Sequence, residues 1–330
     1  MRKNKLIDLY SVFLCIFGVL AVTLRTVACL TSLDRITMHF DDKVLINIAN
    51  WAVVVCLAVF ASYFFAQSKD YSPVASSDSG ATYIPAGLVA VAMLFMAADR
   101  AVSVRVGEYN GQSILKGLAA AVAILAVVSA VSFFVTVFIG KNESVAKSAF
   151  CMALVLFLCL YAAYLYFNRA VHPTNSPIKI VDQLAYLASA VFFLYETRIA
   201  LGYPKWRPYI VSGFAAALLT AYSALPSLIV YFARGYVLSD SLFETVLTLT
   251  LCAYITSRVL LTKRLHSGEQ CEAASRIEAL AQKREQEIAD KYSAARTPAE
   301  DNNEENEVVD AENYSFDIPP IKSEEESEEN

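Results

Sequence analysis

The chain has 330 residues, of which 56% are hydrophobic and 18% charged, and its formal net charge is −5. Soluble globular domains hold about 25% charged and about 45–50% apolar residues, so this composition excludes an ordinary water-soluble domain. The 11 Gly, 10 Pro and 7 scattered Cys also exclude a collagen, a disordered chain and a secreted disulfide scaffold. The composition therefore predicts a polytopic membrane protein with a polar appendix.

Eight apolar runs follow one another along the chain, and each is close to the about 20 residues that a helix needs to cross a bilayer. They cover residues 9–30, 44–66, 83–104, 117–140, 148–167, 183–201, 209–233 and 242–261. The runs are continuous, whereas strands of a transmembrane β-barrel alternate apolar and polar residues. Helices are then the structure that satisfies the backbone hydrogen bonds. We expect an all-α transmembrane bundle of about eight helices over residues 1–261.

The distribution of Lys and Arg predicts the orientation of this bundle. With the N-terminus inside, ten Lys and Arg lie on the cytoplasmic side and seven in the outer loops. The basic N-terminal cluster and the pair Lys263–Arg264 after the last run agree with this orientation. We therefore expect a multi-pass protein of the cell (inner or plasma) membrane with both termini in the cytoplasm. In an alternative interpretation, the first run is a signal sequence that ends near Cys29, which leaves seven spans.

Five charged residues fall near the outer ends of the predicted helices. They are Arg25, Asp99, Arg100, Asp182 and Glu244. Ionisable side chains inside a membrane usually face the bundle interior with a partner, so this set predicts an outer polar pocket. Simpler roles compete with that prediction. Ser241 and Glu244 fit a capping box, Asp182 suits the first turn of a helix, and the remaining three suit the membrane interface.

Glu196 and Arg258 lie toward the inner ends of the sixth and eighth runs. Each is 14 residues from the acid at the other end of its helix, Asp182 or Glu244, and this spacing places both charges of a helix within about 40° on one face. Because Glu196 and Arg258 have opposite charges at one depth, we predict an intramembrane salt bridge between them. In the alternative, Arg258 extends to the lipid headgroups.

Motifs of enzymatic chemistry do not occur in the sequence. His39, His172 and His266 lie in different segments, without the spacing of a metal site. The sequence has no Walker loop, GxGxxG, Cys-x-x-Cys or G-x-S-x-G motif. We therefore predict no cofactor, metal or catalytic residue and no nucleic-acid partner, and we favour a protein that is not an enzyme. The predicted partners are the lipid bilayer and a cytosolic protein.

The composition changes after the last run. Residues 262–296 have the content of a solvated juxtamembrane helix, and Arg284 and Glu287 interrupt the heptad that a stable coiled coil would need. Residues 297–330 are acidic and poor in large apolar residues, which predicts a disordered tail. One island in this tail is a predicted docking peptide, formed by Tyr314, Phe316, Ile318, Pro319, Pro320 and Ile321.

The net charge divides sharply between the two parts of the chain. Residues 1–261 hold 19 Lys and Arg and 13 Asp and Glu, which sum to +6, whereas residues 262–330 hold 8 and 19, which sum to −11. A cationic bundle suits the anionic inner leaflet, which repels the tail. We expect a sensor or anchor whose acidic tail recruits a partner. The alternative is a transporter of small solutes or ions that uses the charges of the sixth and eighth runs, and a lipid-processing enzyme is a third, less favoured possibility.

Overall fold

A computed structural model describes residues 4–66, 80–109, 111–139, 145–168, 176–201, 205–261, 279, 282–283 and 285–290. Up to residue 261 these form eight helices. They are α1 (Asn4–Thr31), α2 (Val44–Ala66), α3 (Gly80–Val106), α4 (Ser113–Ile139), α5 (Val145–Phe167), α6 (Pro177–Ala200), α7 (Trp206–Arg234) and α8 (Leu242–Leu261). Each helix overlaps one predicted run, and the predicted all-α bundle of membrane helices is confirmed.

Seven of these eight helices are long and apolar enough to cross a membrane. The other is α5, whose apolar stretch within the described residues, Cys151–Phe167, is shorter than the about 20 residues of a typical span. Its neighbours in the bundle are α4 and α6. The protein is therefore a multi-pass membrane protein.

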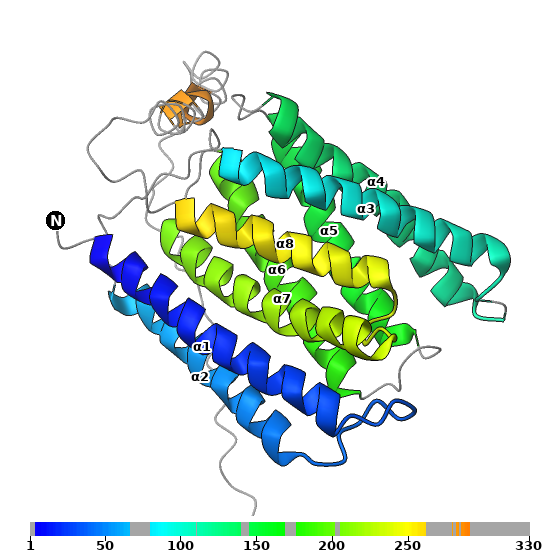
Figure 1. The fold of residues 1–330 in the computed structure, drawn as a ribbon. Coiled ribbons are helices and arrows are strands. Elements are labelled where there is room, and N and C mark those ends of the chain that lie inside the picture. Colours follow the sequence, from blue (N-terminus) through cyan, green and yellow to red (C-terminus); the bar gives the residue numbers. More distant parts are fainter. Residues whose placement is uncertain are drawn as a thin grey trace, which may run out of the picture. The chain divides into compact units, whose positions relative to one another are not determined.

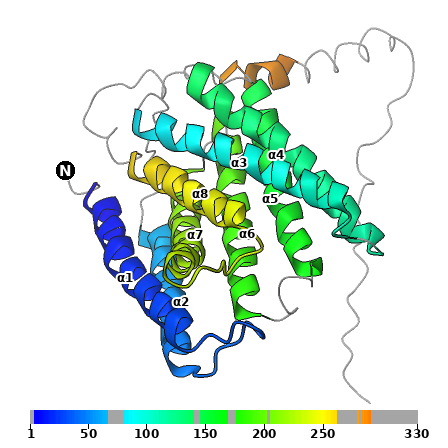
Figure 2. The same ribbon diagram turned by 45° about the vertical axis from the view of Figure 1, so that its right-hand side comes forward.

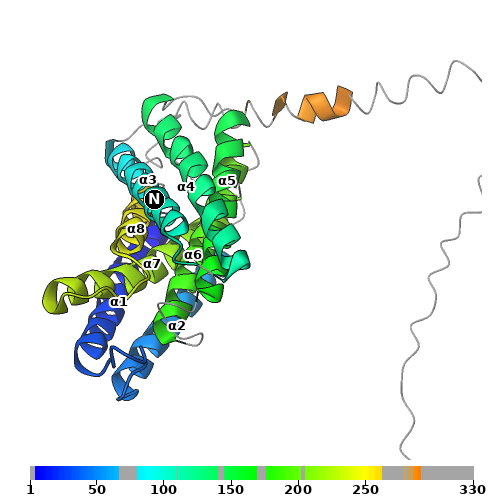
Figure 3. The ribbon, with the colours of Figure 1, turned by 90° about the vertical axis from the view of Figure 1, so that its right-hand side faces the viewer.

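Six helices form a closed ring, in which α3, α4, α5, α6, α7 and α8 each pack against the next and α8 packs against α3. Figures 1 and 2 show α8 between α3 and α7. The hairpin of α1 and α2 packs on α7, on the far side of the bundle from α4 (Figure 3). Because α7 packs against α6, α8 and the hairpin, 72% of its most apolar 18-residue stretch is buried, the largest such share among the seven spans.

Aromatic side chains fill the interior of the ring. The ring centroids of Phe133 on α4 and Tyr254 on α8 are 5.2 Å apart, although these two helices are not neighbours in the ring. Elsewhere in the ring, Tyr161 on α5 and Tyr186 on α6 meet edge to face, with their ring centroids 4.9 Å apart. Such pairs stabilise a core by about 0.5–1.5 kcal/mol beyond their buried area.

Gly213 on α7 allows three helices of the ring to meet. A Cβ atom there would overlap the side chain of Val259 on α8 and lie 3.2 Å from the ring of Phe192 on α6. Helices in a bilayer associate through close packing, and small residues permit the backbones to approach. Gly213 therefore determines how closely α7 approaches α6 and α8.

Connections between the helices gather at two ends of the bundle. One end, here called the Asp240 end, holds residues 32–43, the turn after α3, the end of α5, the start of α6 and residues 235–241. At the other, called the Arg258 end, α6 ends, α7 begins and α8 ends. In the predicted orientation the Asp240 end faces outward.

The loop between α1 and α2 is held by a short turn at Asp34. The Asp34 carboxylate accepts hydrogen bonds from Thr37 Oγ1 at 2.7 Å and from the backbone N–H of Ile36 at 3.0 Å. These bonds, that from the Thr37 hydroxyl above all, lower the pKa of Asp34 below its ordinary value. Beyond the turn, the backbone carbonyl of Met38 accepts a bond from Ser176 Oγ at 3.2 Å, which joins this loop to the start of α6.

The bundle lies within one compact unit, residues 1–282, and residues 283–330 form a second unit. Beyond Leu261 the described residues, 279, 282–283 and 285–290, are helical and exposed. The rest of the predicted juxtamembrane helix (262–296) and the whole predicted acidic tail (297–330) lie outside the described residues. So does the predicted docking peptide of Tyr314, Phe316, Ile318, Pro319, Pro320 and Ile321.

Candidate functional site: a buried charge network

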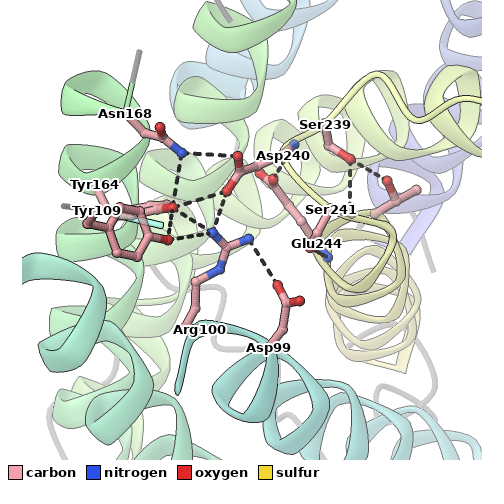
Figure 4. A network of polar contacts seen from close by, with 10 residues as sticks. Asp99, Arg100, Tyr109, Tyr164, Asn168, Ser239, Asp240, Ser241 and Glu244 are labelled. Atoms are coloured by element: carbon pink, nitrogen blue, oxygen red, sulfur yellow. Dashed lines mark hydrogen bonds and ion pairs between the residues drawn. The ribbon is translucent and has the colours of Figure 1, made fainter. Parts of the chain in front are cut away.

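Arg100 on α3 is the centre of a polar network at the Asp240 end (Figure 4). Its guanidinium lies 2.5 Å from Asp240 Oδ2 and 3.1 Å from Asp99 Oδ2. Only 4% of the side chain of Arg100 and 4% of that of Asp240 are exposed, against 24% for Asp99. A buried charge is costly unless it is paired and hydrogen-bonded, and the two carboxylates meet that requirement for Arg100.

Tyr164 on α5 joins this ion pair to three further groups. Its hydroxyl accepts a hydrogen bond from Arg100 Nη1 at 2.5 Å, donates to Asp240 Oδ2 at 3.2 Å and lies 2.9 Å from the hydroxyl of Tyr109. Asn168 Nδ2 lies 3.0 Å from both Tyr164 Oη and Asp240 Oδ1. The network therefore ties α3, the turn after it and α5 to the segment that precedes α8.

Glu244 belongs to this network through the start of α8. Ser241 Oγ accepts a bond from the backbone N–H of Glu244 at 3.2 Å, and Glu244 Oε2 accepts one from the backbone N–H of Asp240 at 2.9 Å. This is the predicted capping box in a shifted form, because the glutamate reaches the residue before the serine. Glu244 thus begins the helix and lies beside Asp240 at the same time.

Asp182 on α6 and Arg25 on α1 extend the network across the bundle. Asp182 Oδ1 accepts a hydrogen bond from Ser223 Oγ on α7 at 2.5 Å. The guanidinium of Arg25 lies 4.5 Å from the centroid of the Tyr222 ring, a cation–π contact that stabilises by about 2 kcal/mol where water is excluded. Asp182 is within electrostatic range of both Arg25 and Glu244. Charges from α1, α3, α6 and α8 are therefore brought together.

Four of the five residues predicted to form an outer polar pocket are buried. The exposed fractions are 2% for Arg25, 3% for Arg100, 3% for Asp182 and 1% for Glu244. Arg100 and Glu244 lie in the network that Asp240 and Tyr164 complete, whereas Arg25 contacts Tyr222 and Asp182 bonds Ser223. An open pocket around them stays a prediction.

The Arg258 end holds a second, smaller network. Arg258 Nη2 on α8 lies 2.9 Å from Glu196 Oε1 on α6, which also accepts a bond from the hydroxyl of Tyr254 at 2.9 Å. The exposed fractions of the Arg258 and Glu196 side chains are 8% and 7%. The two residues predicted to form an intramembrane salt bridge are thus brought together inside the bundle.

No family model, curated protein or solved structure matches this chain. The site is therefore interpreted from its own chemistry. Within the part of the chain that the structure describes, no three His, Cys, Asp or Glu side chains are grouped so that they could hold a metal ion. What the network provides is a set of buried charges that join helices of the bundle to one another.

Four residues of the network at the Asp240 end were not predicted from the sequence. They are Tyr109, Tyr164, Asn168 and Asp240. Tyr109, Asn168 and Asp240 lie just outside the apolar runs, where polar residues are common, and Tyr164 is one of several tyrosines in its run. A signal was available for Asp240, since an acid that precedes a capping serine lies close to Glu244 in any helix that starts there.

Proposed function

We propose that the chain is a multi-pass sensor or anchor of the cell membrane whose acidic C-terminal segment recruits a cytosolic protein. The position of α8 carries this proposal. Its first turn holds Glu244 beside Asp240, its last turn holds Arg258, and the chain continues from Leu261 into the acidic segment. A change in charge at the Asp240 end alters the contacts of α8 with α3 and α5.

The proposed orientation places both termini in the cytoplasm and the Asp240 end outside. The basic N-terminus and the pair Lys263–Arg264 support it through the positive-inside rule. The acidic segment, with a sum of −11, is then repelled by the anionic inner leaflet and is available to a partner that carries a basic surface.

The recruitment is tested by crosslinking the full chain in its own membranes and identifying what it captures. We expect a chain that ends at Leu261 and the double variant Tyr314→Ala with Phe316→Ala to lose one specific partner. The matched control, Val308→Ala with Val309→Ala, changes the same acidic segment outside the aromatic island and should retain it. Capture of the same proteins by the truncated chain contradicts the proposal.

The sensing step has its own test, because Asp240→Asn removes one charge of the network and leaves the C-terminal segment unchanged. We expect this variant to reach the membrane and to capture a different amount of the partner. An unchanged amount would leave an anchor without a sensing role.

One observation favours the alternative, a transporter of small solutes or ions. Glu196 Oε2 is buried and has no hydrogen-bond partner among the described residues, so this carboxylate can still receive a ligand. Uptake into proteoliposomes that Glu196→Gln abolishes would support this class. Its matched control is Glu108→Gln, which changes an exposed glutamate in the turn after α3.

A further inference from the structure

Glu244 and Asp182 are the two acids of the network for which the structure provides no ion pair within its described residues. Arg100 pairs with Asp99 and Asp240 instead. Glu244 Oε2 accepts the backbone N–H of Asp240, whereas Oε1 is buried and has no hydrogen-bond partner among the described residues. With 1% of the residue exposed, Glu244 is shielded from bulk solvent, so a negative charge on Oε1 is costly.

Charged and titratable groups approach Glu244 from several elements. Asp240 from the preceding segment bonds Glu244 Oε2 through its backbone N–H, and Asp182 on α6 and Arg100 on α3 lie within electrostatic range. The hydroxyls of Tyr186 on α6 and Tyr161 on α5 also lie within electrostatic range of Glu244. The helix α7 contributes Ser223, which is uncharged and bonds Asp182. Two of the three charged neighbours are thus themselves acids.

Tyr161 on α5 provides a second observation inside the ring. Its ring stacks on that of Tyr164 at 5.6 Å, and its hydroxyl is fully buried and has no hydrogen-bond partner among the described residues. The hydroxyl of Tyr186, by contrast, lies 2.7 Å from Thr248 Oγ1 and is engaged. Glu244 Oε1 and Tyr161 Oη are therefore two buried oxygens, one on α8 and one on α5, that have no partner among the described residues.

We propose that Glu244 is a proton-binding site, in which Oε1 carries the proton. Two carboxyl groups buried side by side resist becoming negative together, and a proton on one of them removes that repulsion. The proton also neutralises Oε1, a buried oxygen for which no hydrogen-bond donor lies within reach among the described residues. Oε2 remains the acceptor for the Asp240 N–H, which is the role of the carbonyl oxygen of a neutral acid.

The binding step is a simple protonation. A hydronium ion from the aqueous phase at the Asp240 end transfers its proton to Oε1, an O–H bond forms there, and water is released; no electron is transferred. This inference deepens the proposed function, because it names the proton as the ligand that the network senses. The sensing role rests on the proposed function, whereas the binding of a proton by Glu244 does not.

Infrared spectroscopy of the full chain in lipid nanodiscs, labelled with carbon-13 glutamate, tests the site. We expect a band of a neutral carboxylic acid that disappears reversibly as the buffer is made alkaline. Glu244→Gln should lose that band completely. Glu196→Gln, which changes a buried glutamate that is already paired, should retain it. A band that persists in Glu244→Gln, or a folded wild-type chain that shows none at any pH, overturns the proposal.

A second variant keeps the test decisive if Glu244→Gln does not fold. Asp240→Asn removes the acid that bonds Glu244 through its backbone, so it should lower the midpoint of the band by about one pH unit, a tenfold change in proton affinity. Asp41→Asn, at an exposed aspartate of the loop after α1, should leave the midpoint unchanged. Equal midpoints in both variants overturn the assignment of the proton to Glu244. A midpoint that follows sodium concentration at constant pH would assign the site to a metal cation and overturn the proton assignment.

The infrared result and the capture experiment can fail separately. If the infrared band is normal but no partner is captured, the sensor proposal is wrong and the proton-site proposal stands. If a partner is captured but the wild-type chain shows no neutral glutamate, the proton-site proposal is wrong and the recruitment proposal stands.

Discussion

Arg258 on α8 and Glu196 on α6 form an ion pair at 2.9 Å inside the Arg258 end of the bundle. Removing one partner of a buried pair leaves the other charge without compensation, which costs about 3–5 kcal/mol. We therefore expect Glu196→Arg and Arg258→Glu each to lower the thermal unfolding temperature in detergent strongly. The double variant with both charges reversed should recover part of the loss. If it is no more stable than either single variant, direct pairing does not explain the stability of this end.

The hydroxyl of Tyr164 offers a second prediction, because it bonds Arg100, Asn168 and Asp240 at once. Tyr164→Phe leaves these buried polar groups with one partner fewer, and we expect a loss of about 1–3 kcal/mol. Tyr166→Phe changes an exposed residue on the same helix and should be nearly neutral. Thermal unfolding of the two variants, measured together, separates the role of the network from a general effect on α5.

Close packing at Gly213 leads to a third prediction. Gly213→Ala adds a Cβ atom that overlaps Val259, so we expect a loss of about 1–3 kcal/mol through displacement of α8 from α7. Gly117→Ala is the matched control, because a Cβ there meets nothing within 4 Å. A neutral result at Gly213, again from thermal unfolding, would indicate that α8 can move away without cost.

The turn at Asp34 should depend on pH. Because the folded structure lowers the pKa of Asp34, its carboxylate stabilises the turn at pH values above the ordinary Asp pKa of about 3.9. That stabilisation is lost as the pH falls through the lowered pKa. We expect hydrogen exchange of the Ile36 and Thr37 amides, corrected for intrinsic rates, to accelerate only at the acidic end. Asp34→Asn should exchange fast at every pH, whereas Asp41→Asn should behave as the wild type.

Helix positions could be predicted from the sequence because a membrane span needs an uninterrupted apolar run, and that pattern is local. The pairing of Glu196 with Arg258 could also be inferred, since two opposite charges at one depth in a bilayer have few other partners. Both arguments need only the distance along a helix axis. They do not depend on which helices are neighbours.

Predicting the network at the Asp240 end requires knowledge of which helices are neighbours. Asp240 lies outside the apolar runs, so its depth in the bundle could not be estimated from hydropathy. Its bond to Arg100 exists because α8 closes the ring against α3, which is a property of the helix order around the ring. The position of Glu244 inside an apolar run predicted that it faces the interior, but its neighbours follow from the same closure of the ring.

The closure of the ring by α8 also has a consequence for how the protein is made. Chains are synthesised from the N-terminus, so α3 and α6 leave the ribosome before α8 does. Glu196 then enters the bilayer before Arg258 exists, and Arg100 enters before Asp240. We therefore expect the earlier helices to stay at the insertion machinery, or to be shielded by it, until the segment before α8 supplies Asp240 and α8 supplies Arg258. Chains that end before residue 240 are expected to contain complete α3 and α6 helices that are not stably inserted in the membrane.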